Sequence, residues 1–185
     1  DFNDISKVEV FRGPQGTLFG RNTMAGLINL YTVSPFQEEG LKVKLGVANY
    51  DTYNAAFNFR KKISDKFALS LSANYNTRDG FYTNQFTGKS CGDEEVAGAN
   101  LKLQFRPTSS LDITLSSIYE YSNQDGYAYQ MYDKSTQEVS PINYNDYAGY
   151  KRNMSVNSLK IAYTHEKFLM NSVTSYQFLT DDMNL

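Results

Sequence analysis

Hydrophobic and polar positions alternate along most of the chain from Leu41 onward. In LKVKLGVANY, one face holds Leu41, Val43, Leu45 and Val47, and the intervening positions are polar or small. Successive side chains of a β-strand point to opposite faces, so this period of two predicts a strand with one apolar face. The same alternation predicts six further strands, in YNAAFNFRKK, FALSLSANYNT, AGANLKLQFR, LDITLSSIYEY, NSLKIAYT and FLMNSVTSYQF.

Two of these stretches depart from strict alternation. Ile118 interrupts the pattern of the fifth strand, and the seventh strand mixes its two faces. For the seventh strand, the best alternating set predicts an apolar face made of Phe168, Met170, Thr174, Tyr176 and Phe178.

The connections between the predicted strands alternate in length. KKISDK, RPTSS and THEK are short, whereas residues 78–95 and 122–152 are long, polar and rich in Gly, Asn and Asp. A membrane β-barrel has short turns at one rim and long loops at the other, whereas a soluble β-sandwich has more evenly spaced turns. The alternation therefore favours a transmembrane antiparallel β-barrel, with a soluble β-sandwich that acts in binding or adhesion as the alternative. Aromatic residues near strand ends fit the girdles of such a barrel: Phe67, Phe105, Tyr75 and Tyr121.

The first 35 residues form a separate unit in the pattern. Val8 and Val10 alternate with charged residues, RGPQG predicts a turn, and LINLYT predicts a second strand that ends at Ser34-Pro35. The glycines of RGPQGTLFGR do not have the spacing of a P-loop, and no Lys-Ser or Lys-Thr follows them. The dinucleotide pattern G-x-G-x-x-G is also absent, so the motif does not predict a nucleotide site.

This stretch, VEVFRGPQGTLFGRNTMAGLINLYT, resembles the end of the plug domain of TonB-dependent outer-membrane receptors. The matching positions are Val8, Glu9, Val10, Arg12, Gly13, Pro14, Leu18, Gly20, Gly26, Ile28 and Asn29. Phe19 stands where the family usually has Tyr, and Ala25 stands where it often has a second glycine. The family continues into a barrel of about 22 strands, which the alternating stretches also resemble.

The resemblance implies an all-β protein with two parts: residues 1–36, the C-terminal part of a plug domain, and residues 37–185, the first six or seven barrel strands. It implies a receptor in the bacterial outer membrane, in contact with its lipid, that takes up a scarce ligand, most often a ferric siderophore. Energy would come through TonB, which grips a segment upstream of this sequence. Seven strands are odd in number and fewer than the roughly eight of the smallest bacterial barrels, so we expect the chain to be a fragment. Its N-terminus also lacks the pattern of a signal peptide.

The resemblance also suggests site residues in the plug motif. We expect the glycines to supply positive φ or close backbone approach. Glu9 and Arg12 have two equally weighted interpretations: they meet charges that face the barrel lumen, or they form a solvated surface pair worth about 0–1 kcal/mol. The candidate partners on the polar strand faces are Lys42, Lys44, Arg60, Lys102 and Lys160. The full set of expected plug residues is Glu9, Arg12, Gly13, Pro14, Gly16, Gly20, Arg21, Gly26 and Asn29.

Tyrosines gather in and just before the second long connection: eight of the 15 lie between Tyr119 and Tyr150. Tyrosine combines a rigid apolar ring with a hydroxyl and is favoured in binding surfaces, although it also suits strands. Tyr127, Tyr129 and Tyr132 are the candidate ligand contacts.

Composition and charge argue against several other classes of function. The net charge of −2 gives no basic face for nucleic acid, and the apolar stretches are far shorter than the roughly 20 residues of a spanning helix. Cys91 and His165 each stand alone, so we expect no disulfide, no metal site and no cofactor. No Ser, His and Asp set predicts nucleophilic catalysis, and we expect no enzyme.

Overall fold

Seven long strands form one antiparallel sheet in the computed structural model, which describes residues 5–20, 22–126, 128–146 and 148–184. Each strand pairs with its neighbour in the chain, in the order β13-β12-β9-β8-β5-β4-β3. The seven predicted strands are thus confirmed. Their bounds are β3 Gly40–Ala48, β4 Thr52–Lys62, β5 Phe67–Arg78, β8 Glu94–Thr108, β9 Leu111–Asp125, β12 Gly149–His165 and β13 Phe168–Asn184.

The register gives this sheet one polar and one apolar face. Asn58 lies opposite Lys42 and Ser72, and Ser70 lies opposite Lys102, so the polar positions of β3, β4, β5 and β8 share a face. On the other face, apolar side chains remain exposed, up to 80% for Val47. The pairing of Leu159 with Thr174 puts the predicted apolar set of β13 on this same face.

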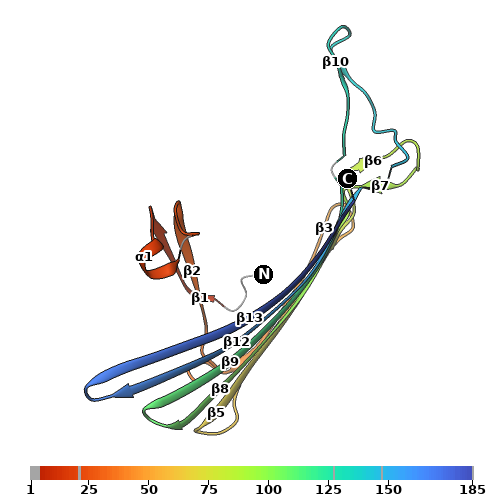
Figure 1. The fold of residues 1–185 in the computed structure, drawn as a ribbon. Coiled ribbons are helices and arrows are strands. Elements are labelled where there is room, and N and C mark those ends of the chain that lie inside the picture. The colour runs from red at the N-terminus through yellow and green to blue at the C-terminus, as the bar shows by residue number, and fades with distance from the viewer. Residues whose placement is uncertain (1–4, 21, 127, 147, 185) are drawn as a thin grey trace.

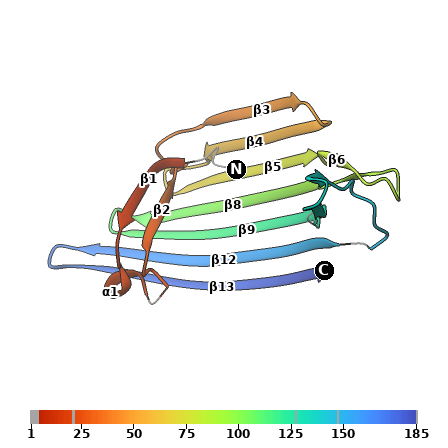
Figure 2. The same cartoon turned by 90° about the horizontal axis from the view of Figure 1, so that it is seen from above.

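A two-stranded hairpin precedes the large sheet. Strands β1 (Ile5–Arg12) and β2 (Gly26–Thr32) pair with each other, and the one-turn helix α1 (Gly16–Phe19) lies in the connection between them. Seen edge-on, the large sheet is curved, and the hairpin lies over its concave side (Figure 1). From above, β1 and β2 run across the long strands instead of parallel to them (Figure 2). Residues 33–39, here called the linker, join the hairpin to β3.

Two long loops lie at one end of the sheet, together with the short β3–β4 turn (residues 49–51), and the other short turns lie at the opposite end (Figures 1 and 2). The first long loop, residues 79–93, contains the short strands β6 (Tyr82–Thr83) and β7 (Ser90–Cys91). The second, residues 126–148, contains β10 (Tyr132–Asp133) and β11 (Glu138–Val139). The expected loop 122–152 was too long, because β9 and β12 pair from Asp125 and Gly149 inward.

The structure also decides between the two predicted architectures. A β-sandwich requires two sheets packed face to face, whereas the long strands here make a single curved sheet with only the hairpin over it. The sandwich alternative was therefore wrong. In the described part of the chain, no helix has the length and hydropathy needed to cross a membrane.

Candidate functional site: the hairpin, its linker and the long loops

The hairpin motif is shaped by its glycines. Gly13 and Gly20 have positive φ, and a Cβ at Gly26 would lie 2.6 Å from the carbonyl oxygen of Phe11 on the paired strand. Gly16 has neither property: it begins α1 with open space around it, so the expectation for this residue was wrong. Pro14 lies exposed in the turn after Gly13, and Arg21 lies outside the described residues.

Glu9 lies in a small polar network on the hairpin itself. Its carboxylate pairs with Lys7 and accepts a 2.9 Å hydrogen bond from the Tyr31 hydroxyl, which in turn accepts one of 2.8 Å from Asn29. The Lys7 hydrogen bond is the main cause that lowers the pKa of Glu9, and the bond to Glu9 raises the pKa of Tyr31. The partners of Glu9 are thus in β1 and β2 and not on the large sheet.

Arg12 is exposed and has no ion-pair partner within residues 5–20, 22–126, 128–146 and 148–184. Three of the cations expected to face the plug charges contact the linker or its start instead. Lys42 and Arg60 bind Glu38, while Lys102 donates to Thr32 at the end of β2. Lys44 and Lys160 likewise have no acidic partner among the described residues.

The linker is bound to the polar face of the sheet along most of its length. The Ser34 hydroxyl donates to Gln104 at 2.7 Å, and Lys102 donates to the carbonyl of Val33 at 3.5 Å. Farther along, the Arg106 guanidinium lies 4.3 Å from the ring centroid of Phe36. Strand β8 therefore supplies a row of polar side chains that follows the linker.

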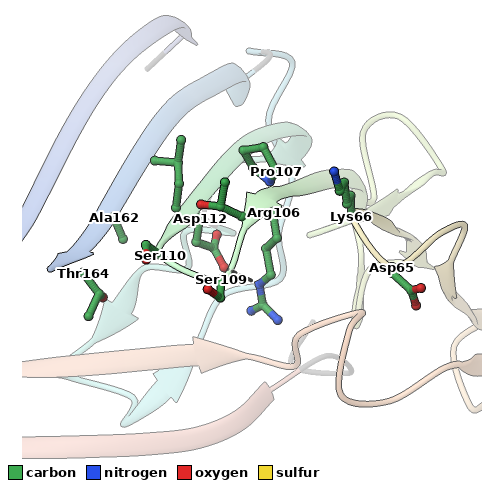
Figure 3. Close-up of a pocket in the computed structure, with 11 residues that line it drawn as sticks. Asp65, Lys66, Arg106, Pro107, Ser109, Ser110, Asp112, Ala162 and Thr164 are labelled. Carbon is green, nitrogen blue, oxygen red and sulfur yellow. Dashed lines mark hydrogen bonds and ion pairs between the residues drawn. The ribbon is translucent and has the colours of Figure 1, made fainter. Parts of the chain in front are cut away.

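The short-turn end of the sheet holds a cavity of about 610 Å³. Figure 3 shows Arg106 and Asp112 meeting at its edge, where the Arg106 Nε donates to a carboxylate oxygen at 2.6 Å. Lys66 and Ser110 from neighbouring turns and Thr164 near the end of β12 also line it, and Thr164 donates its amide to the Ser110 carbonyl at 2.8 Å. No group of three His, Cys, Asp or Glu side chains suited to a metal occurs in the part of the chain that is described.

The two long loops are joined to each other. Asn84 in the first loop donates its side-chain amide to the Tyr144 carbonyl at 2.8 Å, and the Gln85 amide donates to the Ile142 carbonyl at 2.8 Å. Both Asn84 and Ile142 are buried. The sequence offered no indication of this junction, because the residues that meet are about 60 positions apart and lack a shared motif.

A second cavity, of about 540 Å³, lies between the loops. Cys91 is buried at its wall, where its thiol donates to the Tyr82 carbonyl at 3.6 Å. Burial is the main cause that raises the pKa of Cys91, followed by the charges of Asp125 and Asp93. Burial likewise raises the pKa of Tyr144, a lining residue that the sequence analysis did not select.

The predicted ligand-contact tyrosines lie on the second loop but outside this cavity. Tyr129 is 69% exposed and Tyr132 is 58% exposed, close to the β10–β11 turn. Tyr127 lies outside the described residues. The structure therefore leaves two of the three candidate side chains open to an approaching molecule.

Solved structures share this arrangement over nearly the whole chain. The ferric yersiniabactin uptake receptor FyuA from Yersinia pestis matches with a TM-score of 0.80 and 24% identity, covering 97% of this chain and 29% of that one. The siderophore receptor PiuA from Acinetobacter baumannii matches with a TM-score of 0.78 and 14% identity, covering 97% and 27%. This chain has the fold of a TonB-dependent receptor.

Curated sequences agree with this fold, and the resemblance to TonB-dependent receptors is confirmed. The pesticin receptor of Yersinia enterocolitica is 26% identical over 192 residues, which covers 94% of this chain and 26% of the relative. The vitamin B12 transporter BtuB of Vibrio vulnificus is 34% identical over 77 residues, or 42% of this chain and 13% of the relative. The chain spans about a quarter of the length of the first relatives. No family model matches it.

Proposed function

We propose that the full-length protein is a TonB-dependent receptor of the bacterial outer membrane that imports a ferric siderophore. The observation that carries this proposal is the hairpin held by its linker over the polar face of a curved sheet, in an arrangement similar to the ferric yersiniabactin uptake receptor. Residues 1–36 then belong to the plug and residues 37–185 to the barrel wall.

The exposed apolar face supports a place in lipid. Side chains such as Leu45 and Val47 point away from the hairpin and are largely exposed, as outward-facing side chains of a membrane barrel are. In water, an apolar surface of this extent would drive association. Contact with outer-membrane lipid gives it a favourable environment.

Ligand uptake would use the end of the sheet that carries the long loops. We assign this end to the cell exterior and Tyr129 and Tyr132 to ligand contact, since both rings are exposed and amphipathic. TonB would act through a segment upstream of residue 1. The similarity to a vitamin B12 transporter makes cobalamin the second candidate ligand.

Uptake assays test the proposal in a strain that lacks its own siderophore and cobalamin receptors. Cells that express the full-length protein should accumulate radiolabelled ferric siderophore, and deletion of TonB should abolish the accumulation. Accumulation of cobalamin alone would replace the first ligand with the second. Accumulation of neither ligand across a panel of siderophores would contradict the proposed function.

The tyrosine assignment needs a separate comparison. Replacing Tyr129 and Tyr132 together with Ala should weaken ligand binding by about 10-fold or more, because each aromatic contact contributes roughly 0.5–1.5 kcal/mol. Tyr163→Ala at the opposite end of the sheet is the matched control and should leave affinity unchanged. Equal affinities of the double variant and the control would remove these tyrosines from the site.

A further inference from the structure

The most deeply buried large side chains of the described residues lie where the linker meets the sheet. They are Arg60, Asn58 and Pro35, each with less than 2% of its surface exposed. Arg60 and Asn58 are on the polar face of β4, and Pro35 is in the linker. A buried arginine is costly unless its charge and its N–H groups are satisfied.

Glu38 satisfies Arg60 at two points. The Arg60 Nε donates to the Glu38 carbonyl at 3.2 Å, and an Nη donates to the Glu38 carboxylate at 2.5 Å. Lys42 on β3 reaches the same carboxylate at 3.3 Å. One linker residue is thus bound by cations from two adjacent strands, through both its backbone and its side chain.

The hairpin is attached differently. The hydrogen bonds of Ser6 and Thr23 and the Glu9 network join residues of the hairpin to one another. Contacts to the sheet begin at Thr32, with Lys102, and continue through Ser34 to Glu38. These contacts fix the linker to the sheet.

We propose that Arg60 is a positioning residue that anchors the linker through Glu38, so that the hairpin moves about a fixed point during import. This inference rests on the proposed function. Without the anchor, a pull from upstream of residue 1 displaces the linker together with the hairpin, and the hairpin no longer moves about a fixed point. Import then slows, while ligand binding at the loop end is unchanged.

Glu38→Ala in the full-length protein tests the anchor, with Glu39→Ala as its matched control. Glu39 is the next residue and pairs with Lys61 at 2.9 Å, but both of those side chains are about half exposed. The readout is hydrogen exchange at the Gln37 and Glu38 amides, which both donate to the Ser34 carbonyl. We expect exchange to rise about tenfold in Glu38→Ala, since a hydrogen bond to a charged group is lost, and to change little in the control.

Import by the same variants gives the second readout. Glu38→Ala should lower the maximal uptake rate severalfold at an unchanged half-saturating ligand concentration, and Glu39→Ala should match the wild type. Equal exchange in the two variants would overturn the anchor. Faster exchange with an unchanged uptake rate would overturn its role in import. If the wild type imports nothing, the proposed function fails, and the exchange comparison alone decides whether Glu38 fixes the linker.

Discussion

The linker is held to the large sheet and the first long loop is held to the second long loop, but different chemical groups make the two sets of contacts. The linker depends on charged side chains, above all the buried Arg60, which binds Glu38 twice. The loop depends mainly on backbone amides and carbonyls, with Asn84 as the principal side chain. A charged contact concentrates the interaction free energy in one residue, whereas backbone contacts spread it over a segment.

Among the substitutions that test this comparison, removal of Arg60 should cause the largest loss of stability. Arg60→Ala in the full-length protein leaves the Glu38 carboxylate with Lys42 alone and opens a space beneath the linker. We expect the free energy of unfolding to fall by about 3 kcal/mol, since two hydrogen bonds of a buried charge are lost. Urea unfolding of the refolded protein in detergent measures the change.

Arg152→Ala is the control for that substitution. Arg152 pairs with Asp181 at 2.8 Å, and both side chains are over one-third exposed. An exposed pair contributes about 0–1 kcal/mol, so this variant should unfold close to the wild type. Equal losses in the two variants would show that burial does not distinguish the linker contact.

Asn84→Ala should have a smaller and more local effect. It removes the donor to the Tyr144 carbonyl, but the Gln85–Ile142 backbone bond remains. We expect the junction of the loops to weaken by about 1–2 kcal/mol, the usual net cost of a lost buried hydrogen bond. Hydrogen exchange at Gln85 reports it, and Asn145→Ala, which also lines the cavity, is the control. Unchanged exchange at Gln85 would mean that the backbone contacts suffice.

The ionisation of Cys91 should have the smallest effect of these on the stability of the loops. Burial and the nearby Asp125 and Asp93 raise the pKa of its thiol in the folded loop above the value in the unfolded chain. The folded loop therefore holds the thiol proton more tightly, and its stability falls as pH rises from the ordinary thiol pKa through the raised one. Alkylation rates against pH should reach half-maximum at higher pH in the folded protein than in urea. Coincident profiles would contradict the raised pKa.

The long strands could be predicted from the sequence because their side chains alternate between lipid-like and polar surroundings with a period of two. Each long strand pairs with the long strand that precedes or follows it in the chain, so the order of strands in the sheet follows the sequence. The ends of β9 and β12 were not predictable, since Ser122 to Asp125 and Gly149 to Arg152 are polar on both faces and form strands only because they pair with each other.

The contacts of the linker and the long loops could not be predicted from the sequence, for a different reason. Arg60 was expected on the polar face, but its partner depends on the path of the linker, which no local pattern specifies. The Asn84–Tyr144 contact joins two loops whose geometry is set by the strands below them. For Glu9, the sequence left a lumen-facing partner and a surface pair equally open, and the structure pairs it with Lys7, two residues away on the same strand face.

The strands that bind the linker also determine when, during folding, the linker can attach to the sheet. Because each strand pairs with its neighbours in the chain, the sheet can grow one strand at a time, from β3 toward β13, and even the two long loops add little to the cost of closure. The linker precedes all of these strands, but Lys102, Gln104 and Arg106 come from the fourth of them. The earliest residues of the chain thus complete their attachment late, after the strand that receives them has formed.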